Sequence, residues 1–177
     1  MTLRDNVLFG KAFDKRKYVE TIVGCQLEAD LGIMPAGDFT EIGEKGINLS
    51  GGQKARVSLA RAVYQEADVI LMDDPISALD ANVRKAIFNQ VFQKLLKGKT
   101  RILVTHAVDF VHLADRIVVM DKGEIQAQGT YEELANNEYM LQILDIHKKH
   151  KKENQEVAAQ ETPENALDQM LDAFEEE

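Results

Sequence analysis

The sequence predicts an α/β layer fold with a mostly parallel sheet, and three observations carry this prediction. Two short apolar runs, at residues 69–72 and 101–105, read as buried strands, and the first is of the type buried on both faces of a parallel sheet. Helical apolar spacing appears before the first run, at 51–65, and between the two runs, at 81–97. Strands that alternate with helices in this way are typical of βαβ units.

The composition fits one globular domain. The chain has 177 residues, of which 45% are hydrophobic and 29% charged, enough for a sizeable core. No apolar stretch approaches the roughly 20 residues of a membrane span, and the N-terminus has no secretory signal. The single Cys25 excludes an internal disulfide, fits a reducing compartment and is expected in the core.

The net charge of −9 is concentrated at the C-terminal end. All 21 Lys and Arg residues lie at or before Lys152, whereas residues 153–177 hold nine acidic residues. Of the 30 acidic residues, 21 therefore remain to balance the 21 basic ones, and the rest of the chain is formally neutral. This balance disfavours a broad nucleic-acid-binding surface.

The first quarter of the chain predicts little regular structure apart from one helix. Residues 14–25 have helical spacing, whereas residues 34–46 contain Pro35, Gly37 and Gly43 and read as a loop. No segment before residue 48 has a strong strand pattern.

The helix at 51–65 is expected to begin at the N-cap residue Ser50. Its predicted core face consists of Ala55, Leu59, Ala62 and Val63, which recur at helical spacing.

The helix at 81–97 has Asp80 as its expected N-cap and Gly98 as its end. Its predicted core face consists of Val83, Ile87, Val91 and Leu95.

Further elements are expected after the second strand. A helix is predicted at 107–114, and two strands at 117–120 and 124–128 are joined by a turn. Thr130 and Glu133 form a capping box that opens another helix.

The C-terminal end reads as a linker, made of the basic run 147–152 and the acidic tail. Within the tail, Thr162 and Pro163 favour a short helix. Its face would consist of Leu167, Met170, Leu171 and Phe174, and could bind a partner. A mostly disordered tail is the alternative.

A phosphate-binding turn is predicted where the first long helix begins. Glycine lets backbone come close to a ligand, and a helix N-terminus offers unpaired amides and partial positive charge. The hydroxyl of Ser50 and the amides of Gly51 and Gly52 could therefore hold a terminal phosphate. An ordinary turn before a helix is the alternative, but the strand that follows and ends in two carboxylates favours the phosphate.

Polar residues follow both predicted parallel strands. Asp73 and Asp74 end the first, where one carboxylate could bind a Mg²⁺-bound water and the other could face an attacking water. His106 follows the second and could donate to a phosphate oxygen. A capping pair and a structural histidine are the alternatives. Ser77 and Asp80 could form a helix cap or a loop that contacts a partner's site.

Together these residues resemble the nucleotide-binding domain of ATP-binding-cassette (ABC) transporters over about residues 1–145. The resemblance implies a P-loop NTPase-like sheet with helices on both faces plus a helical subdomain. It assigns Leu49, Ser50, Gly51, Gly52 and Gln53 to the signature and Ser77 to Asp80 to the D-loop, both in contact with nucleotide. It assigns Asp73 to Walker B as the metal ligand, Asp74 to the catalytic carboxylate and His106 to the switch histidine.

Residues 2–10 and 73–81 resemble the first nucleotide-binding domain of multidrug-resistance-associated (subfamily C) exporters, where Asp replaces the usual catalytic Glu, as Asp74 does here. The resemblance implies a helical subdomain portion at 1–48, an ATPase core at 49–146 and a charged linker at 147–177. It also implies ATP and Mg²⁺ as cofactors, a second nucleotide-binding domain and transmembrane domains as partners, and a place at the cytoplasmic face of a membrane.

The sequence departs from the family in lacking a G-x-x-x-x-G-K-[ST] loop. We therefore expect the chain to match the C-terminal part of such a domain, without the N-terminal Walker A part, and to be inactive alone. One alternative is a non-catalytic, signature-bearing fragment that modulates a complete ABC partner. Another is a DNA-repair or chromosome ATPase, but long coiled-coil heptads and a basic face are both absent.

Overall fold

The computed structural model describes residues 1–43 and 46–160 and confirms a mixed α/β architecture. The chain divides into two compact units, the first comprising Met1–Ala107 and the second beginning at Val108. In the described part of the chain, no helix is both long enough and apolar enough to cross a membrane.

The first unit begins with short helices. They are α1 (Leu3–Leu8), α2 (Lys15–Gly24), α3 (Glu28–Ile33) and the 3₁₀ turn η1 (Gly37–Phe39). The helix predicted at 14–25 is confirmed as α2, where a side-chain oxygen of Asp14 accepts the Lys17 amide at 2.9 Å. The helices α1 and α3 were not predicted, although Thr2 and Asp5 form a capping box at the start of α1.

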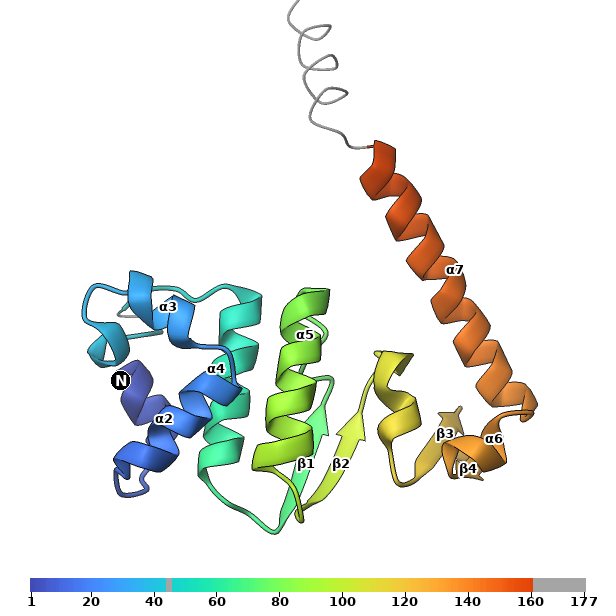
Figure 1. Ribbon diagram of the computed structural model, residues 1–177, viewed down its shortest axis with the longest axis horizontal. Helices are drawn as coiled ribbons and strands as arrows, with labels where there is room; N and C mark the ends of the chain where they lie inside the picture. The colour runs from blue at the N-terminus through green and yellow to red at the C-terminus, as the bar shows by residue number, and fades with distance from the viewer. Residues whose placement is uncertain (44–45, 161–177) are drawn as a thin grey trace, which may run out of the picture. The chain divides into compact units, whose positions relative to one another are not determined.

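The long helix α4 (Gly51–Tyr64) begins after the N-cap Ser50, as predicted. Its buried face differs from the prediction, since it consists of Val57, Leu59, Ala60, Val63 and Tyr64. Both α1 and α2 pack against α4, and Figure 1 shows α2 alongside it. Because α4 is covered from two directions, its buried stripe is wider than one helical face, and Ala55 and Ala62 lie at its half-buried margin.

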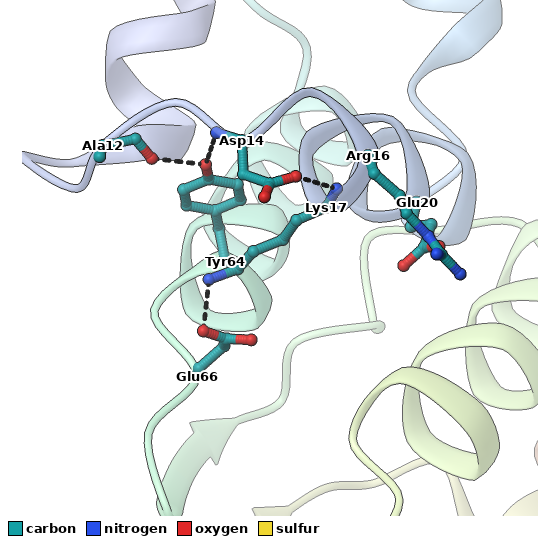
Figure 2. A pocket seen from close by; sticks show the side chains of 7 residues that line it. All are labelled: Ala12, Asp14, Arg16, Lys17, Glu20, Tyr64 and Glu66. Carbon is teal, nitrogen blue, oxygen red and sulfur yellow. Dashed lines mark hydrogen bonds and ion pairs between the residues drawn. The ribbon is translucent and has the colours of Figure 1, made fainter.

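The C-terminal end of α4 is fastened to α2 by polar contacts (Figure 2). The Tyr64 hydroxyl donates to the Ala12 carbonyl at 2.7 Å and accepts from the Asp14 amide at 2.9 Å. The Lys17 ammonium lies 4.4 Å from the centre of the Tyr64 ring and 2.6 Å from a Glu66 carboxylate oxygen. This ion pair holds the pKa of Glu66 below its usual range. The contacts fix how α2 sits on α4.

Cys25 follows α2 and is fully buried, as predicted. Burial raises the pKa of its thiol to about 12, so the reactive thiolate is scarce near neutral pH. We expect Ellman's reagent to modify Cys25 in native buffer roughly a hundredfold or more slowly than in concentrated urea, because reaction requires opening of the first unit. Equal rates in the two solvents would show that Cys25 is accessible in the folded state.

The strands β1 (Val69–Asp73) and β2 (Thr100–Val104) form a parallel pair, as predicted, with Val69 opposite Thr100 and Asp73 opposite Val104. Figure 1 shows the two arrows side by side and pointing the same way. The carboxyl ends of both strands therefore meet at one edge.

The prediction that the first strand is buried on both faces is wrong for β1. Its inward residues Ile70 and Met72 are buried, whereas Leu71 is 73% exposed. The opposite face of the pair is also apolar, and it is more than half exposed at Val69, Leu71, Ile102 and Val104. The first unit covers one face of the pair only, and alternation along a strand places every second residue on the other.

The connection from β1 to β2 is helical, but it is not one continuous α-helix. The helix α5 (Ala81–Ile87) passes into the π-helical segment η2 (Phe88–Leu95). Asp80 is the N-cap and Gly98, at φ 81°, follows the helical connection, as predicted. Of the predicted core face, Ile87 and Val91 are buried, while Val83 and Leu95 are half-buried.

Over residues 108–160, the second unit consists of a 3₁₀ segment, a hairpin and two helices. Its elements are η3 (Val108–Leu113), β3 (Ile117–Asp121), β4 (Glu124–Gly129), α6 (Tyr131–Leu134) and α7 (Glu138–Gln160). The segment η3 replaces the predicted α-helix at 107–114. The strands β3 and β4 are antiparallel, and the turn residues Lys122 and Gly123 both have positive φ, as a type I′ hairpin turn requires.

The core of the second unit consists of Ile117, Val119, Leu134 and Met140. The predicted capping box of Thr130 and Glu133 is confirmed at the start of α6. The basic run 147–152, predicted as a linker, lies within α7. The helix predicted from Thr162 lies outside the described residues, and the three-part division at 48 and 146 stays a prediction.

Candidate functional site

The signature residues form the first turn of α4 and the segment leading into it. The Ser50 hydroxyl oxygen accepts the Gln53 amide at 3.2 Å, and the Gln53 side-chain oxygen accepts the Ser50 amide at 2.9 Å. Leu49 is buried, whereas Ser50 and Gly51 are exposed. The Ser50 hydroxyl keeps its own proton for donation, because its bond to Gln53 uses a lone pair.

The D-loop residues lie directly against this turn. A Cβ atom at Gly52 would lie 3.2 Å from the Ala78 carbonyl oxygen and 3.4 Å from a Leu79 methyl carbon. At Gly51 the nearest atom would be the Ala78 Cβ, 4.0 Å away, which is ordinary contact. The structure therefore brings together the two predicted nucleotide-contacting segments, which are more than twenty residues apart in the sequence.

The D-loop is held by bonds within the chain. A carboxylate oxygen of Asp80 accepts the amides of Asn82 and Val83, each at 3.0 Å. The Val83 amide is the largest cause that lowers the pKa of Asp80. The Ser77 hydroxyl donates to the Asp74 carbonyl oxygen at 3.1 Å. Asp80 and Ser77 therefore have local structural roles, and these roles are compatible with a contact to a partner domain.

The signature is also bonded to a residue that sequence reasoning missed. Asp30, on α3, is 7% exposed and accepts hydrogen bonds from the side chains of Gln53 and Arg56. The only sequence signal for it is an aspartate in a short, otherwise weakly patterned segment.

The two carboxylates stand at the edge where β1 and β2 end. Asp73, the last residue of β1, is exposed and makes no side-chain hydrogen bond among the described residues. Asp74 is half-buried and has φ 42°, an uncommon left-handed conformation for a residue other than glycine. Its amide donates to the Val104 carbonyl at 2.8 Å, so it is fixed to the end of β2.

Thr105 connects Asp74 to the segment that contains His106. The Thr105 hydroxyl donates to a carboxylate oxygen of Asp74 at 3.3 Å and accepts the Ala107 amide at 3.0 Å. His106 is exposed directly after Thr105 and makes no side-chain hydrogen bond among the described residues. The end of β2 therefore places the predicted switch histidine next in sequence to the residue that contacts the predicted catalytic carboxylate.

The described residues contain no group of three or more side chains suited to hold a metal ion. Mg²⁺ commonly uses one or two carboxylates together with waters and phosphate oxygens, so the single exposed carboxylate of Asp73 fits this ligand. Two pockets of about 400 Å³ are lined by neither carboxylate. One is shown in Figure 2, and the other is lined by Leu49 of the signature together with Lys54 and Arg61 among others.

Comparison with known proteins covers most of the chain. The ABC transporter family matches residues 4–77, which include the signature and both carboxylates but not Asp80 or His106. Multidrug resistance protein mrp-7 of Caenorhabditis elegans is 60% identical over 136 residues, which is 76% of this chain and 9% of the relative. ATP-binding cassette sub-family C member 2 of Mus musculus is 56% identical over 75% of the chain and 9% of the relative. The ABC-type transporter cicA of Emericella nidulans is 48% identical over 86% of the chain and 11% of the relative.

The chain thus spans about a tenth of the length of the curated relatives it matches. The family match includes the signature glycines that pack against the D-loop and the carboxylates at the end of β1. The identity to subfamily C transporters extends over three quarters of the chain, and the chain belongs to the ABC transporter family as part of a subfamily C nucleotide-binding domain.

Proposed function

We propose that this chain is part of the ATP-binding and ATP-hydrolysing module of an ABC exporter. In this proposal, Mg-ATP binding and hydrolysis at a head-to-tail pair of nucleotide-binding domains drive transport across a membrane. The observation that carries it is the packing of the signature turn on the D-loop, which gives the chain one exposed surface where a helix N-terminus and glycine backbone can meet phosphate.

The signature surface would close over an ATP that another domain binds. The Ser50 hydroxyl and the Gly51 and Gly52 amides would donate to the terminal phosphate, while the N-terminus of α4 adds partial positive charge. Buried Leu49 would anchor the turn, and Ser77 and Asp80 would contact the partner domain.

The carboxylate edge would serve a second ATP. Asp73 would hold Mg²⁺ or its water, Asp74 would face the attacking water, and His106 would donate to a phosphate oxygen. Aspartate is one methylene shorter than glutamate and so reaches the water less well. We therefore expect this second site to bind ATP better than it hydrolyses it.

The remaining roles follow from membership in subfamily C. The chain would correspond to the first nucleotide-binding domain of an exporter, at the cytoplasmic face of the membrane. Its partners would be the second nucleotide-binding domain and the transmembrane domains. Because the 177 residues hold no G-x-x-x-x-G-K-[ST] loop, this chain alone is expected to have negligible ATPase activity. The same observation favours a second candidate function, that of a non-catalytic partner that modulates a complete ABC protein.

Thiol labelling at the signature tests the proposal. In a transporter that contains this domain, Ser50→Cys is expected to react with maleimide when nucleotide is absent and to be protected by Mg-ATP, because closure covers the turn. Ser58→Cys, exposed on the same helix, is the matched control and is expected to react equally in both conditions. In the 177-residue chain, micromolar Mg-ATP is expected to protect neither position.

Two outcomes would contradict the proposal. Equal labelling of Ser50→Cys with and without Mg-ATP in the transporter would exclude a signature that closes over nucleotide. Protection in the 177-residue chain at micromolar Mg-ATP would show that this chain binds ATP without a partner.

A further inference from the structure

We propose that Asp30 is a positioning residue that sets the geometry of the signature turn from outside it. This inference rests on the proposed function, because it concerns the turn that would meet the phosphate. Asp30 itself lies on α3 and is 7% exposed, so it acts through other side chains.

The Asp30 carboxylate uses its two oxygens for two different partners. One oxygen accepts from the Gln53 side-chain nitrogen at 2.9 Å. The other accepts from Nε and Nη2 of Arg56 at 3.2 and 2.7 Å. The Arg56 side chain is 15% exposed, so this is a largely buried, charge-assisted pair. The pair joins α3 to the first turns of α4.

The bond to Gln53 decides which way the Gln53 amide points. Its nitrogen donates to Asp30, and its oxygen therefore faces the Ser50 amide, which donates to it at 2.9 Å. A reversed amide would place a donor against the Ser50 amide and an acceptor against the carboxylate. Asp30 thus selects the orientation that completes the capping box, and the capping box holds the Ser50 hydroxyl.

The bond to Asp30 also fixes the Arg56 side chain, which lies close to Gly52. A guanidinium nitrogen of Arg56 lies 3.7 Å from the position that a Cβ of Gly52 would take, beside the Ala78 carbonyl. The pKa of Asp80, the cap of α5, is lowered chiefly by the hydrogen bond from the Val83 amide and to a smaller extent by the charge of Arg56. A shift of Arg56 would therefore change the surroundings of Gly52, the signature glycine that packs against the D-loop.

Asp30→Asn separates the effect of the hydrogen bonds that Asp30 accepts from the effect of its packing in the first unit. Asp30→Asn keeps the shape of the side chain but has one acceptor oxygen in place of two. Its NH₂ group would therefore face a donor, either the Gln53 side-chain nitrogen or the Arg56 guanidinium. Asp38→Asn is the matched control. Asp38 is also a partly buried aspartate paired with an arginine, Arg4, at 2.7 Å, and it contacts neither the signature nor the D-loop.

The first measurement is amide hydrogen exchange in the 177-residue chain. Asp30→Asn is expected to speed exchange at the Gln53 and Lys54 amides, which donate to Ser50, by about tenfold, the size of a lost helix cap. Asp38→Asn is expected to leave both amides unchanged. Unchanged exchange in Asp30→Asn, or equal acceleration in both variants, would overturn the inference.

The second measurement is ATP turnover in a transporter that contains this domain. Asp30→Asn is expected to lower kcat about tenfold while the KM for ATP stays within about twofold, because a displaced signature impairs the closed state and not the initial binding. Asp38→Asn is expected to change neither constant. A rise in KM with unchanged kcat would overturn the inference.

The two measurements distinguish this inference from the proposed function. Faster exchange at Gln53 and Lys54 with unchanged turnover would support the positioning of the turn by Asp30 and overturn the role of the signature in hydrolysis. If Asp30→Asn does not fold, Gln53→Met leaves the pair of Asp30 and Arg56 intact and removes both bonds of the Gln53 amide, the one to Asp30 and the one to the Ser50 amide. It is expected to give the same faster exchange at Lys54 and the same loss of kcat, and normal values for both would overturn the inference.

Discussion

Ser50→Arg in a transporter that contains this domain is expected to lower ATP hydrolysis at the site that the signature completes by at least about a hundredfold, the usual effect of losing a donor to a developing charge. ATP binding is expected to stay nearly intact, because the proposed function assigns most phosphate contacts to another domain. The reason is local. Ser50 is exposed at the start of α4, where arginine removes the hydroxyl and fills the space that the phosphate would enter.

The measurement is ATP turnover beside equilibrium ATP binding on the same preparation. Ser58→Arg is the control, because Ser58 is exposed on the same helix and receives the same added charge. The lost N-cap costs about 1 kcal/mol, too little to account for a hundredfold loss of turnover through unfolding of a stable domain. Weakened binding with normal turnover of the ATP that remains bound would contradict the proposed role of Ser50.

Local rules predicted most of the elements that position the site. Ser50, Asp80 and Thr130 each begin a helix as capping chemistry requires, and Gly123 helps to close the hairpin. These features depend on residues within one turn of one another, so the sequence alone contains the necessary information. The parallel pairing of β1 and β2 was also predictable, because a helix connects them.

Features that depend on tertiary contacts were not predictable in the same way. The buried face of α4 is wider than periodicity indicates, because α1 and α2 cover it from two sides. The exposure of Leu71 depends on what covers the outer face of β1, which the spacing of apolar residues does not report. The π-helical segment η2 likewise has no local signal in the sequence.

The candidate site likewise contains residues that the sequence identifies and residues that only tertiary contacts identify. The signature, the carboxylates and His106 are contiguous motifs, and they could be named from the sequence. Asp30 and Thr105 act through bonds that span 23 and 31 residues, to Gln53 and Asp74 respectively. Only the fold brings these pairs together, so the residues that hold the motifs in place emerged from the structure alone.

The two signature glycines are expected to respond differently to substitution, because only one of them touches the D-loop backbone. Gly52→Val is expected to destabilise the first unit by about 1–3 kcal/mol, since added carbon in a packed contact forces its neighbours to shift. The Cβ would lie 3.2 Å from the Ala78 carbonyl oxygen, and backbone gives way less easily than a side chain. Gly51→Ala is expected to leave the free energy of unfolding unchanged or slightly raised. Its Cβ would lie 4.0 Å from the nearest atom, the Ala78 Cβ, and alanine favours the helix more than glycine does.

The labelling rate of Cys25 measures this difference, because that buried thiol reacts when the first unit opens. Gly52→Val is expected to raise the rate about fivefold or more, whereas Gly51→Ala leaves it unchanged or lower. ATP turnover in the transporter then distinguishes an effect on the stability of the first unit from an effect on phosphate binding. Both substitutions are expected to lower kcat. At Gly51 the added carbon lies on the exposed turn that the phosphate would approach, and at Gly52 the added side chain shifts the turn away from the D-loop. Normal turnover in a stably folded Gly51→Ala variant would mean that this exposed glycine serves the turn alone, and the phosphate contact would then have to lie elsewhere on α4.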